Sequence, residues 1–435
     1  MLTSRGCGKA RDTSSKPQDI PLPKSAKLRA KLRLNEATPA TSLGAFHFNF
    51  PSAGAEHQAP IMSDIPVLVI GGCGFVGYHI VKALLAEKNP AFSVHVMSRN
   101  INKNQLPRAE YHTGDFTSEK DVASILEAVQ PVVIFHVASP VPSGNGSSDK
   151  FYFDTNVEGT KTLLRVAATC ERVKAFVYTS SSGVLVGDSY DNGDETWPMK
   201  TSKTRNSNAY ATSKAIADQL VQDHNGKPFL TTCLRVCAVY GERDSQMIPA
   251  MMKILKEGKH RIQIGDNTAK SDRTSGENAA LAHVLAAKAL LAKINNPDAN
   301  RPKVDGEAFF ITDGRPMPTW DFARMVWRAA GDHTPPEQIK VIPAWFILNL
   351  ASLTEWAYWM FTLGYKRPRA FRRMLIETTC VERTFSIQKA KERLGYKPMD
   401  NMDDAIKRGL AFIRQQEAEE ELKRKQKLRD REGSS

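Results

Sequence analysis

Short apolar runs alternate with longer stretches of helical spacing through the first half of this chain. Residues 67–70 (Val-Leu-Val-Ile) form an uncharged, β-branched run of the kind that is buried on both faces of a parallel sheet. Apolar residues with helical spacing follow from Tyr78 to Lys88, and residues 94–97 predict a second strand. Because this alternation continues from Pro66 to about Arg243, we predict an α/β fold with a doubly wound parallel sheet.

A glycine-rich turn separates the first predicted strand from the helix. Gly71, Gly74 and Gly77 allow a tight turn, a close approach to phosphates and close packing of helix on strand. The amides at the start of the helix, including those of Phe75 and Val76, together with its dipole, favour an anion. The turn therefore predicts a dinucleotide site of the Rossmann type, and the alternative is a glycine-rich turn without a ligand.

The end of the second strand bears on the choice of cofactor. NAD-binding proteins usually place an acidic residue about twenty residues beyond the glycines, and Ser98 and Arg99 stand there in this chain. No carboxylate repels a 2′-phosphate at these positions, and a guanidinium can pair with one. The pattern favours NADP over NAD, whereas in the other interpretation Arg99 is a solvated loop charge.

A second motif predicts proton transfer. A phenol is a poor base because its pKa is about 10. Tyr210 and Lys214 are one helical turn apart, so the lysine charge is expected to favour the phenolate. Residues 177–182 read as a strand that runs into a hydroxyl-rich turn, where a serine could hold the substrate oxygen. The alternative for Tyr210 is an ordinary aromatic residue on a helix face.

Further segments add a family resemblance from about Pro66 to Leu410. The chain is similar to the extended short-chain dehydrogenases/reductases, and among them to the fungal branch of the 3β-hydroxysteroid dehydrogenase and sterol-4α-carboxylate 3-dehydrogenase family. The resemblance implies catalytic roles for Ser181, Tyr210 and Lys214 and a supporting role for Asn156. The matching segments are 112–115 (His-Thr-Gly-Asp), 136–139 (His-Val-Ala-Ser), 156–160 (Asn-Val-Glu-Gly-Thr), 234–241, 309–313 and 391–398.

The resemblance also extends the cofactor site. It implies that Asp115 and Phe116 lie at the adenine ring and that Ala138 lies beside the cofactor, together with the glycine turn, Tyr210 and Lys214. By the same resemblance the enzyme acts on the 3β-hydroxyl or 3-ketone of a sterol or steroid, with loss of a C4 carboxylate where the substrate carries one.

The chain departs from the family pattern at three places. Val236 replaces a proline, and Ser98 stands where an acidic residue is usual. Residues 272–278 (Asp-Arg-Thr-Ser-Gly-Glu-Asn) replace a segment that normally has aromatic residues after its Asp and Thr. Loss of two large apolar groups there is expected to reshape the substrate pocket.

The chain divides into four parts by composition. Residues 1–61 are rich in Lys, Arg, Ser and Pro and read as a disordered basic extension, with a mitochondrial transit segment or a biological start at Met62 as alternatives. Residues 62–243 are the expected Rossmann domain, and 244–414 a smaller substrate lobe interleaved with the last sheet strands. Residues 415–435 are a charged tail.

Residues 344–363 (AWFILNLASLTEWAYWMFTL) are the most apolar part of the C-terminal half. A helix of about twenty residues is long enough to span a bilayer, but Glu355 would cost about 3 kcal/mol at its centre. The tryptophans suit the headgroup region, and the basic cluster that follows suits anionic lipid. We therefore expect a monotopic contact with the endoplasmic reticulum membrane. The alternative is an apolar helix that covers the substrate lobe of a cytoplasmic protein.

Composition sets further limits. The net charge of +13 is spread along the chain without zinc-finger spacing or RNA-binding aromatic motifs, so nucleic acid is not expected as a partner. The six cysteines show neither a Cys-x-x-Cys nor a metal-ligand pattern, which predicts a reduced intracellular protein without a metal site. A homodimer is compatible with the sequence.

Three functions remain open at this point. The first is an NAD(P)-dependent 3β-hydroxysteroid or sterol dehydrogenase. The second is a nucleotide-sugar epimerase or dehydratase, which residues 344–363 disfavour because they are apolar. The third is a cofactor-sensing module without activity, which the joint presence of Ser181, Tyr210 and Lys214 disfavours.

Overall fold

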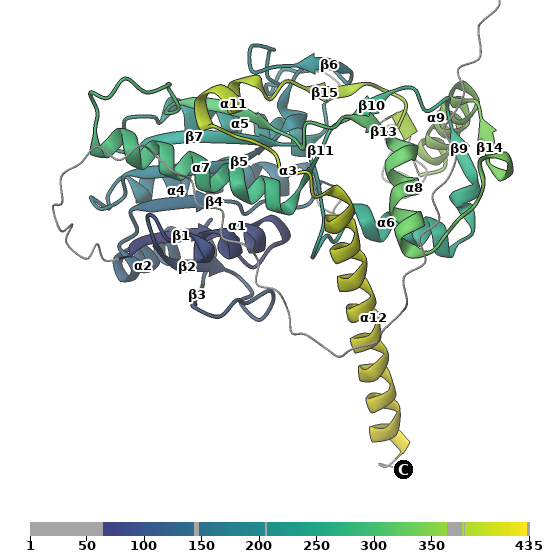
Figure 1. The fold of residues 1–435 in the computed structure, drawn as a ribbon, viewed down its shortest axis with the longest axis horizontal. Coiled ribbons are helices and arrows are strands. Elements are labelled where there is room, and N and C mark those ends of the chain that lie inside the picture. Colours follow the sequence, from purple (N-terminus) through teal and green to yellow (C-terminus); the bar gives the residue numbers. More distant parts are fainter. Residues whose placement is uncertain (1–63, 143–147, 205–206, 363–375, 378, 433–435) are drawn as a thin grey trace, which may run out of the picture. The chain divides into compact units, whose positions relative to one another are not determined.

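A sheet of seven parallel strands forms the centre of the fold in the computed structural model (Figure 1). The strand order is β12-β7-β5-β4-β1-β2-β3. The predicted doubly wound α/β fold is therefore confirmed. The strands are β1 (Ile65–Ile70), β2 (Phe92–Ser98), β3 (Ala109–Thr113), β4 (Val133–His136), β5 (Ala175–Ser181), β7 (Leu230–Val236) and β12 (Glu307–Ile311).

The structure describes residues 64–142, 148–204, 207–362, 376–377 and 379–432. The basic extension predicted for residues 1–61 lies outside these ranges. All described residues belong to the unit Ile61–Ser435.

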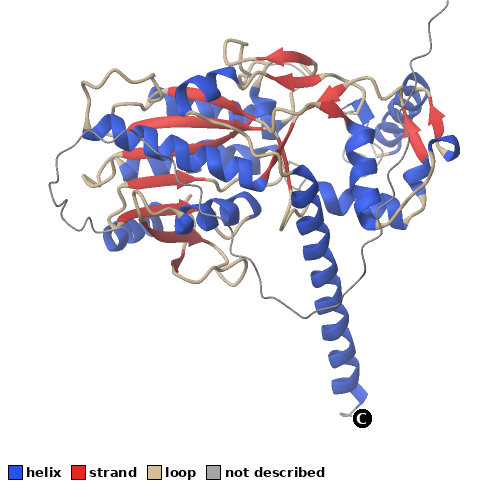
Figure 2. Cartoon of the chain, in the orientation of Figure 1, coloured by secondary structure: helices blue, strands red, loops and turns tan. Residues whose placement is uncertain are grey.

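Helices cover both faces of the sheet (Figure 2). On one face, α1 (Phe75–Ala86), α7 (Gly276–Asn295) and α11 (Gln388–Leu394) bury apolar side chains. On the other face lie α2 (Glu119–Val129), α4 (Gly159–Ala167) and α5 (Ala209–Asp223). Since β1 has helices on both sides, its residues 67–70 are almost completely buried, as their apolar run predicts.

The strand order reverses between β1 and β4, which lie side by side in the sheet. Ligands of open parallel sheets bind beyond the carboxyl ends of the strands at such a switch point. Gly71 follows β1, Ala138 follows β4, and Ser181 ends β5. Residues far apart in sequence thus meet at one edge of the sheet.

The second half of the chain contributes both to the main sheet and to a smaller lobe. Strand β12 pairs with β7 in the main sheet. The lobe contains a sheet of order β13-β10-β15-β6. These four strands are β6 (Tyr190–Gly193), β10 (Lys270–Ser271), β13 (Met317–Pro318) and β15 (Arg383–Phe385).

Helices α6 (Met247–Lys256), α8 (Thr319–Ala330) and α12 (Met402–Glu432) pack together in this lobe. Their shared core includes Tyr240, Ile248 and Phe322. Two further strand pairs complete the lobe: β8 (Ala238–Tyr240) with β11 (Arg273–Ser275), and β9 (Ile262–Ile264) with β14 (Lys340–Ile342).

Helix α9 (Ala344–Phe361) corresponds to the apolar segment of the sequence. Only Ile347 and Ala351 of this helix are buried, and they pack in a small cluster with Ile376. Its remaining large apolar side chains are exposed: Trp345, Phe346, Leu350, Leu353, Trp356, Tyr358, Trp359, Met360 and Phe361. Within the described ranges, no helix is both long enough and apolar enough to cross a bilayer.

Candidate active site

The glycine turn after β1 has a backbone conformation and close contacts that leave no room for a Cβ atom. Gly71 has φ +85°, and a Cβ atom there would lie 2.8 Å from the backbone of Ala138. A Cβ atom on Gly77 would lie 2.2 Å from the carbonyl oxygen of Gly71. Both glycines are therefore required for α1 to begin directly against the turn.

The start of α1 provides a site for an anion. Gly74 is the N-cap residue, no side chain caps the helix, and its first turn contains no acidic residue. The first amides of a helix lack partners within the helix, so those of Phe75, Val76 and Gly77 are available to a pyrophosphate. The turn thus fits the cofactor that the sequence predicts.

Ser98 and Arg99 lie at the carboxyl end of β2, beside the glycine turn. The Arg99 side chain is 69% exposed, and its Nη1 atom lies 4.0 Å from a carboxylate oxygen of Asp115. Asp115 also accepts hydrogen bonds from the amide and the hydroxyl of Thr117. Because the Arg99–Asp115 pair is loose and solvated, it constrains the guanidinium only weakly.

Phe116 and Ala138 occupy different environments within the predicted cofactor site. The ring of Phe116 is buried, with its centroid 4.9 Å from the ring centroid of His136. Any cofactor contact of Phe116 is therefore left to its backbone. The amide of Ala138 donates to the carbonyl oxygen of Ile70, which holds this segment against the glycine turn.

Tyr210 and Ser181 meet at the carboxyl end of β5. Ser181 ends this strand, and its side chain lies close enough to the Tyr210 phenol, near the start of α5, to lower the pKa of that phenol. The ring of Tyr152 packs edge-on against Tyr210 at a centroid distance of 6.0 Å. The two residues that the sequence assigns to substrate oxygen and proton are therefore neighbours at this end of the sheet.

The pKa values of Tyr210 and Lys214 differ from those that the sequence alone leads us to expect. Burial raises the pKa of Tyr210 to about 12, partly offset by the Ser181 hydrogen bond. Burial also lowers the pKa of Lys214 to about 7, whereas the nearby Asp218 carboxylate raises it. Loss of solvent is thus the largest influence on both groups, and the effect of Lys214 on the acidity of Tyr210 stays a prediction.

Asn156 lies in a π-helical turn, residues 154–158, directly before α4. Its side-chain amide donates to Ser213 Oγ at 2.9 Å, and its carbonyl oxygen accepts from Ser139 Oγ at 3.0 Å. Asn156 therefore links the helix that carries Tyr210 to the segment after β4. Its contacts are those of a positioning residue.

A buried ion pair behind the catalytic residues has no counterpart among the sequence predictions. Asp218 accepts hydrogen bonds from Arg235 Nε at 3.0 Å and from Ser180 Oγ at 2.5 Å. Asp218 and Arg235 are almost fully buried. The pair joins α5, β5 and β7 next to Ser181. The spacing of 210, 214 and 218 on one helix face is the signal that would have identified Asp218.

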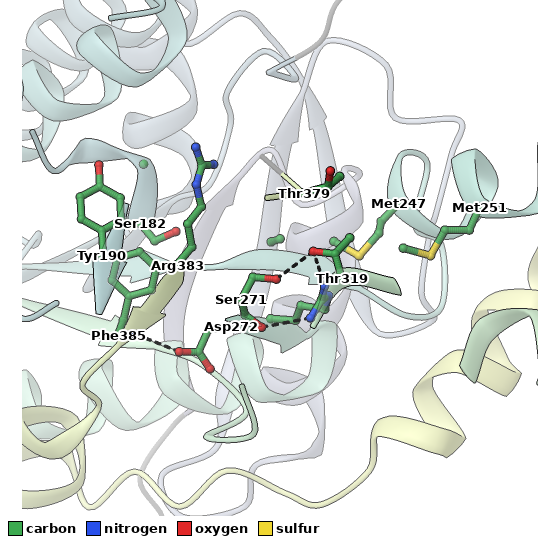
Figure 3. A pocket seen from close by; sticks show the side chains of 13 residues that line it. Ser182, Tyr190, Met247, Met251, Ser271, Asp272, Thr319, Thr379, Arg383 and Phe385 are labelled. Carbon is green, nitrogen blue, oxygen red and sulfur yellow. Dashed lines mark hydrogen bonds between the residues drawn. The ribbon is translucent and has the colours of Figure 1, made fainter. Parts of the chain in front are cut away.

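A cavity of about 270 Å³ adjoins the catalytic turn (Figure 3). Ser182 and Gly183, which directly follow Ser181, form part of its wall. Its other lining residues are Tyr190, Ala238, Met247, Met251, Ser271, Asp272, Arg273, Thr319, Thr379, Arg383 and Phe385. The departure at residues 272–278 divides between two environments: Arg273 lines the cavity, whereas Ser275 caps α7 and is absent from the lining.

Val236, another departure from the family pattern, is buried at the end of β7, where it pairs with Ser181 and Ile311. A proline at this position would lack the N–H that a central strand uses. Valine is therefore compatible with continuing the sheet up to the catalytic turn.

Solved structures share this architecture. UDP-glucose 4-epimerase from Thermotoga maritima is 20% identical, with a TM-score of 0.60 over 81% of this chain and 99% of that one. The dTDP-glucose 4,6-dehydratase of Streptomyces venezuelae is 19% identical, with a TM-score of 0.59 over 81% and 97%. At these identities the likeness shows the fold alone.

Sequence comparison identifies the family. The model of the 3-beta hydroxysteroid dehydrogenase/isomerase family matches residues 68–341. The sterol-4-alpha-carboxylate 3-dehydrogenase (decarboxylating) of Schizosaccharomyces pombe is 36% identical over 80% of this chain and 97% of its own length. The Saccharomyces cerevisiae enzyme of the same name is 34% identical over the same shares. The chain therefore belongs to the 3-beta hydroxysteroid dehydrogenase/isomerase family.

Proposed function

We propose that the protein is an NAD(P)-dependent dehydrogenase that oxidises the 3β-hydroxyl group of a sterol. The observation that carries this proposal is the proximity of Ser181 and Tyr210 at the sheet edge that also holds the glycine turn. Relatives at 34–36% identity are named sterol 3-dehydrogenases, whereas the sugar-nucleotide enzymes share only the fold.

The residues divide the work of proton transfer. Ser181 holds the substrate oxygen, and Tyr210 accepts the hydroxyl proton. The bound nicotinamide would supply the hydride acceptor. A phenol with a pKa of about 12 is almost entirely protonated at neutral pH, so very little of the phenolate base is present. Catalysis therefore requires a nearby positive charge that favours the phenolate. Lys214 in its protonated form, one helical turn from Tyr210, is the residue that would provide it.

Decarboxylation needs no additional catalytic group. Oxidation of the C3 alcohol beside a C4 carboxylate gives a β-keto acid, and its C4–carboxyl bond breaks with release of carbon dioxide. The electron pair passes into an enolate, which is then protonated. The relatives' printed names include this outcome.

NADP is the cofactor that we favour. Arg99 is exposed beside the glycine turn, where its guanidinium is free to reach a 2′-phosphate. Several structural neighbours were solved with NAD, among them the Streptomyces venezuelae dehydratase, which supports a nicotinamide cofactor in general.

Helix α9 is the part of the protein that we propose to contact a membrane, that of the endoplasmic reticulum. Its exposed apolar residues include three tryptophans, and Trp345 and Trp359 are 67% and 62% exposed. Such a contiguous apolar surface is uncommon on proteins that remain in water. An interfacial helix would bury these side chains at the headgroup boundary and bring the lobe close to a substrate dissolved in the bilayer.

The decisive experiment is an assay of the full-length protein in detergent. NADP or NAD is added with a 3β-hydroxysterol, and the absorbance of the reduced cofactor is followed. We expect reduction that depends on the sterol. Turnover with a UDP-sugar but with no sterol would instead identify an epimerase or dehydratase. Tight cofactor binding without any turnover would identify a sensor.

A further inference from the structure

The cavity beside the catalytic turn has an apolar end and a polar end (Figure 3). Met247 and Met251 lie on one side in this view, and Ser182, Tyr190 and Arg383 lie on the other. Ser182 directly follows the serine that holds the reacting oxygen. The polar end therefore adjoins the position of the reacting hydroxyl group.

Arg383 lies at this polar end with Asp188 and Glu377 near enough to favour its charge, and with hydrogen-bond donors that remain free among the described residues. Its Nε atom donates to the backbone carbonyl oxygen of Asp188 at 3.1 Å. In the described part of the chain, its Nη atoms have no hydrogen-bond acceptor, and no carboxylate lies within 4.0 Å of it. Burial lowers the pKa of Arg383, but a guanidinium remains protonated at neutral pH. A half-buried cation whose Nη atoms lack an acceptor gains when an anion binds.

Arg273, the other arginine of the cavity, already forms hydrogen bonds and a ring contact within the protein. Its Nη1 atom donates to the carbonyl oxygens of Ser271 and Met317 at 3.0 and 3.3 Å. Its guanidinium also lies over the ring of Phe322, 4.4 Å from the centroid. The neighbouring Asp272 brings a negative charge to the same wall. Arg383 is therefore the side chain with donors left for a ligand.

We propose that Arg383 binds a carboxylate on the substrate carbon next to the one that bears the reacting hydroxyl. This inference rests on the proposed function and names the residue that selects an acidic sterol. A carboxylate at that carbon stands within a few ångströms of the hydroxyl held by Ser181. The two Nη atoms of Arg383 can donate to both of its oxygens, as paired guanidinium and carboxylate groups commonly do. The methionine end of the cavity then receives apolar parts of the sterol.

The test compares two substrates that differ only in this group. Full-length protein in detergent is assayed with a 3β-hydroxysterol that carries a 4α-carboxylate and with the same sterol without it. Arg383→Leu should lower kcat/KM for the acid about 10- to 100-fold and change that for the neutral sterol less than about threefold. Arg383→Lys should retain part of the preference, because it keeps the charge but not the paired donors.

Arg172→Leu is the matched control. Arg172 is an exposed arginine just before β5, at the end of the strand opposite Ser181, and its loss should leave both rates unchanged. Equal loss of both rates in Arg383→Leu would overturn the inference, since it would mean that Arg383 only anchors the loop at Asp188. No change in the kcat/KM of Arg383→Leu for either sterol would also overturn it. If Arg383→Leu fails to fold, the ratio in Arg383→Lys decides: an unaltered preference for the acid overturns the inference.

Failure of the underlying function has a different signature. If the wild-type protein turns over neither sterol, the dehydrogenase proposal itself is wrong. If the wild type oxidises both sterols and Arg383→Leu alters neither rate selectively, the dehydrogenase stands and only the role of Arg383 falls.

Discussion

The Lys214 ammonium nitrogen lies 2.6 Å from the backbone carbonyl oxygen of Thr179, two residues before the catalytic serine. The same nitrogen is 4.1 Å from the ring centroid of Tyr178. This contact ties helix α5 to strand β5 through a side chain that is 2% exposed. Lys214 therefore holds the helix that carries Tyr210 against β5.

The burial of Lys214 predicts a specific pH dependence of stability. Its folded pKa of about 7 lies below the unfolded value of about 10.4, so the unfolded chain binds more protons between these values. Unfolding free energy should then rise with pH across this window, by up to about 1.4 kcal/mol per pH unit. Lys214→Met should lack this rise in urea unfolding measured from pH 6 to 10. Parallel curves for the two proteins would contradict the low pKa.

Replacement of Tyr210 tests the catalytic assignment. Tyr210→Phe removes the proton acceptor but keeps the ring that packs on Tyr152. We expect kcat to fall at least about 100-fold, while the cofactor dissociation constant from fluorescence titration stays within about twofold. Undiminished turnover in this variant would assign the base to another residue.

Asp218 and Arg235 should matter for stability far more than a surface pair does. Asp218→Ala leaves a buried guanidinium without its carboxylate, so we expect a loss of about 3–5 kcal/mol in chemical denaturation. Replacing both residues with apolar ones should recover much of this loss. Glu119→Ala is the control, because the Glu119–Arg165 pair is exposed and should contribute far less to stability than the buried pair. Equal effects of Asp218→Ala and Glu119→Ala would refute the argument.

Arg99 is expected to set cofactor preference. Arg99→Asp should raise KM for NADP and lower the NADP-to-NAD ratio of kcat/KM by about tenfold or more, because a carboxylate repels the 2′-phosphate. Lys103→Asp, which makes the same charge change at an exposed position nearby, controls for the general field. A similar shift in both variants would show that Arg99 has no specific contact.

Helix α9 is expected to bind lipid. Substituting Trp345, Trp356 and Trp359 together by Ser should reduce cosedimentation with vesicles of phosphatidylcholine and phosphatidylserine. Activity in detergent should stay unchanged. Leu422→Ser provides the control, since Leu422 is an equally exposed apolar residue on α12. Membrane binding that survives the triple substitution would assign the contact to another surface.

Local patterns were sufficient to predict the sheet, the glycine turn after its first strand and the helix that carries Tyr210 and Lys214. The run at 67–70 and the glycines after it specify a buried strand and a phosphate turn within a dozen residues. The spacing of Tyr210 and Lys214 places them on one face of a single helix. The first helix begins at Phe75 rather than Tyr78, because Gly77 packs inside its first turn.

Contacts between segments that are far apart in the sequence could not be predicted from local sequence patterns. The Asp218–Arg235 pair connects a helix to a strand, and Arg383 reaches the cavity from the other end of the chain. The pKa values of Tyr210 and Lys214 depend on how much protein surrounds them, which spacing alone does not reveal. Such quantities follow from tertiary packing.

The pairing of β12 with β7 has a consequence for biosynthesis. While the chain emerges from the ribosome, β7 is complete long before residues 307–311 arrive to cover its outer edge. In that interval the nascent protein displays a bare row of amides and carbonyls, the kind of template on which strands from other chains add. A chaperone that shields this edge would raise the yield of native enzyme.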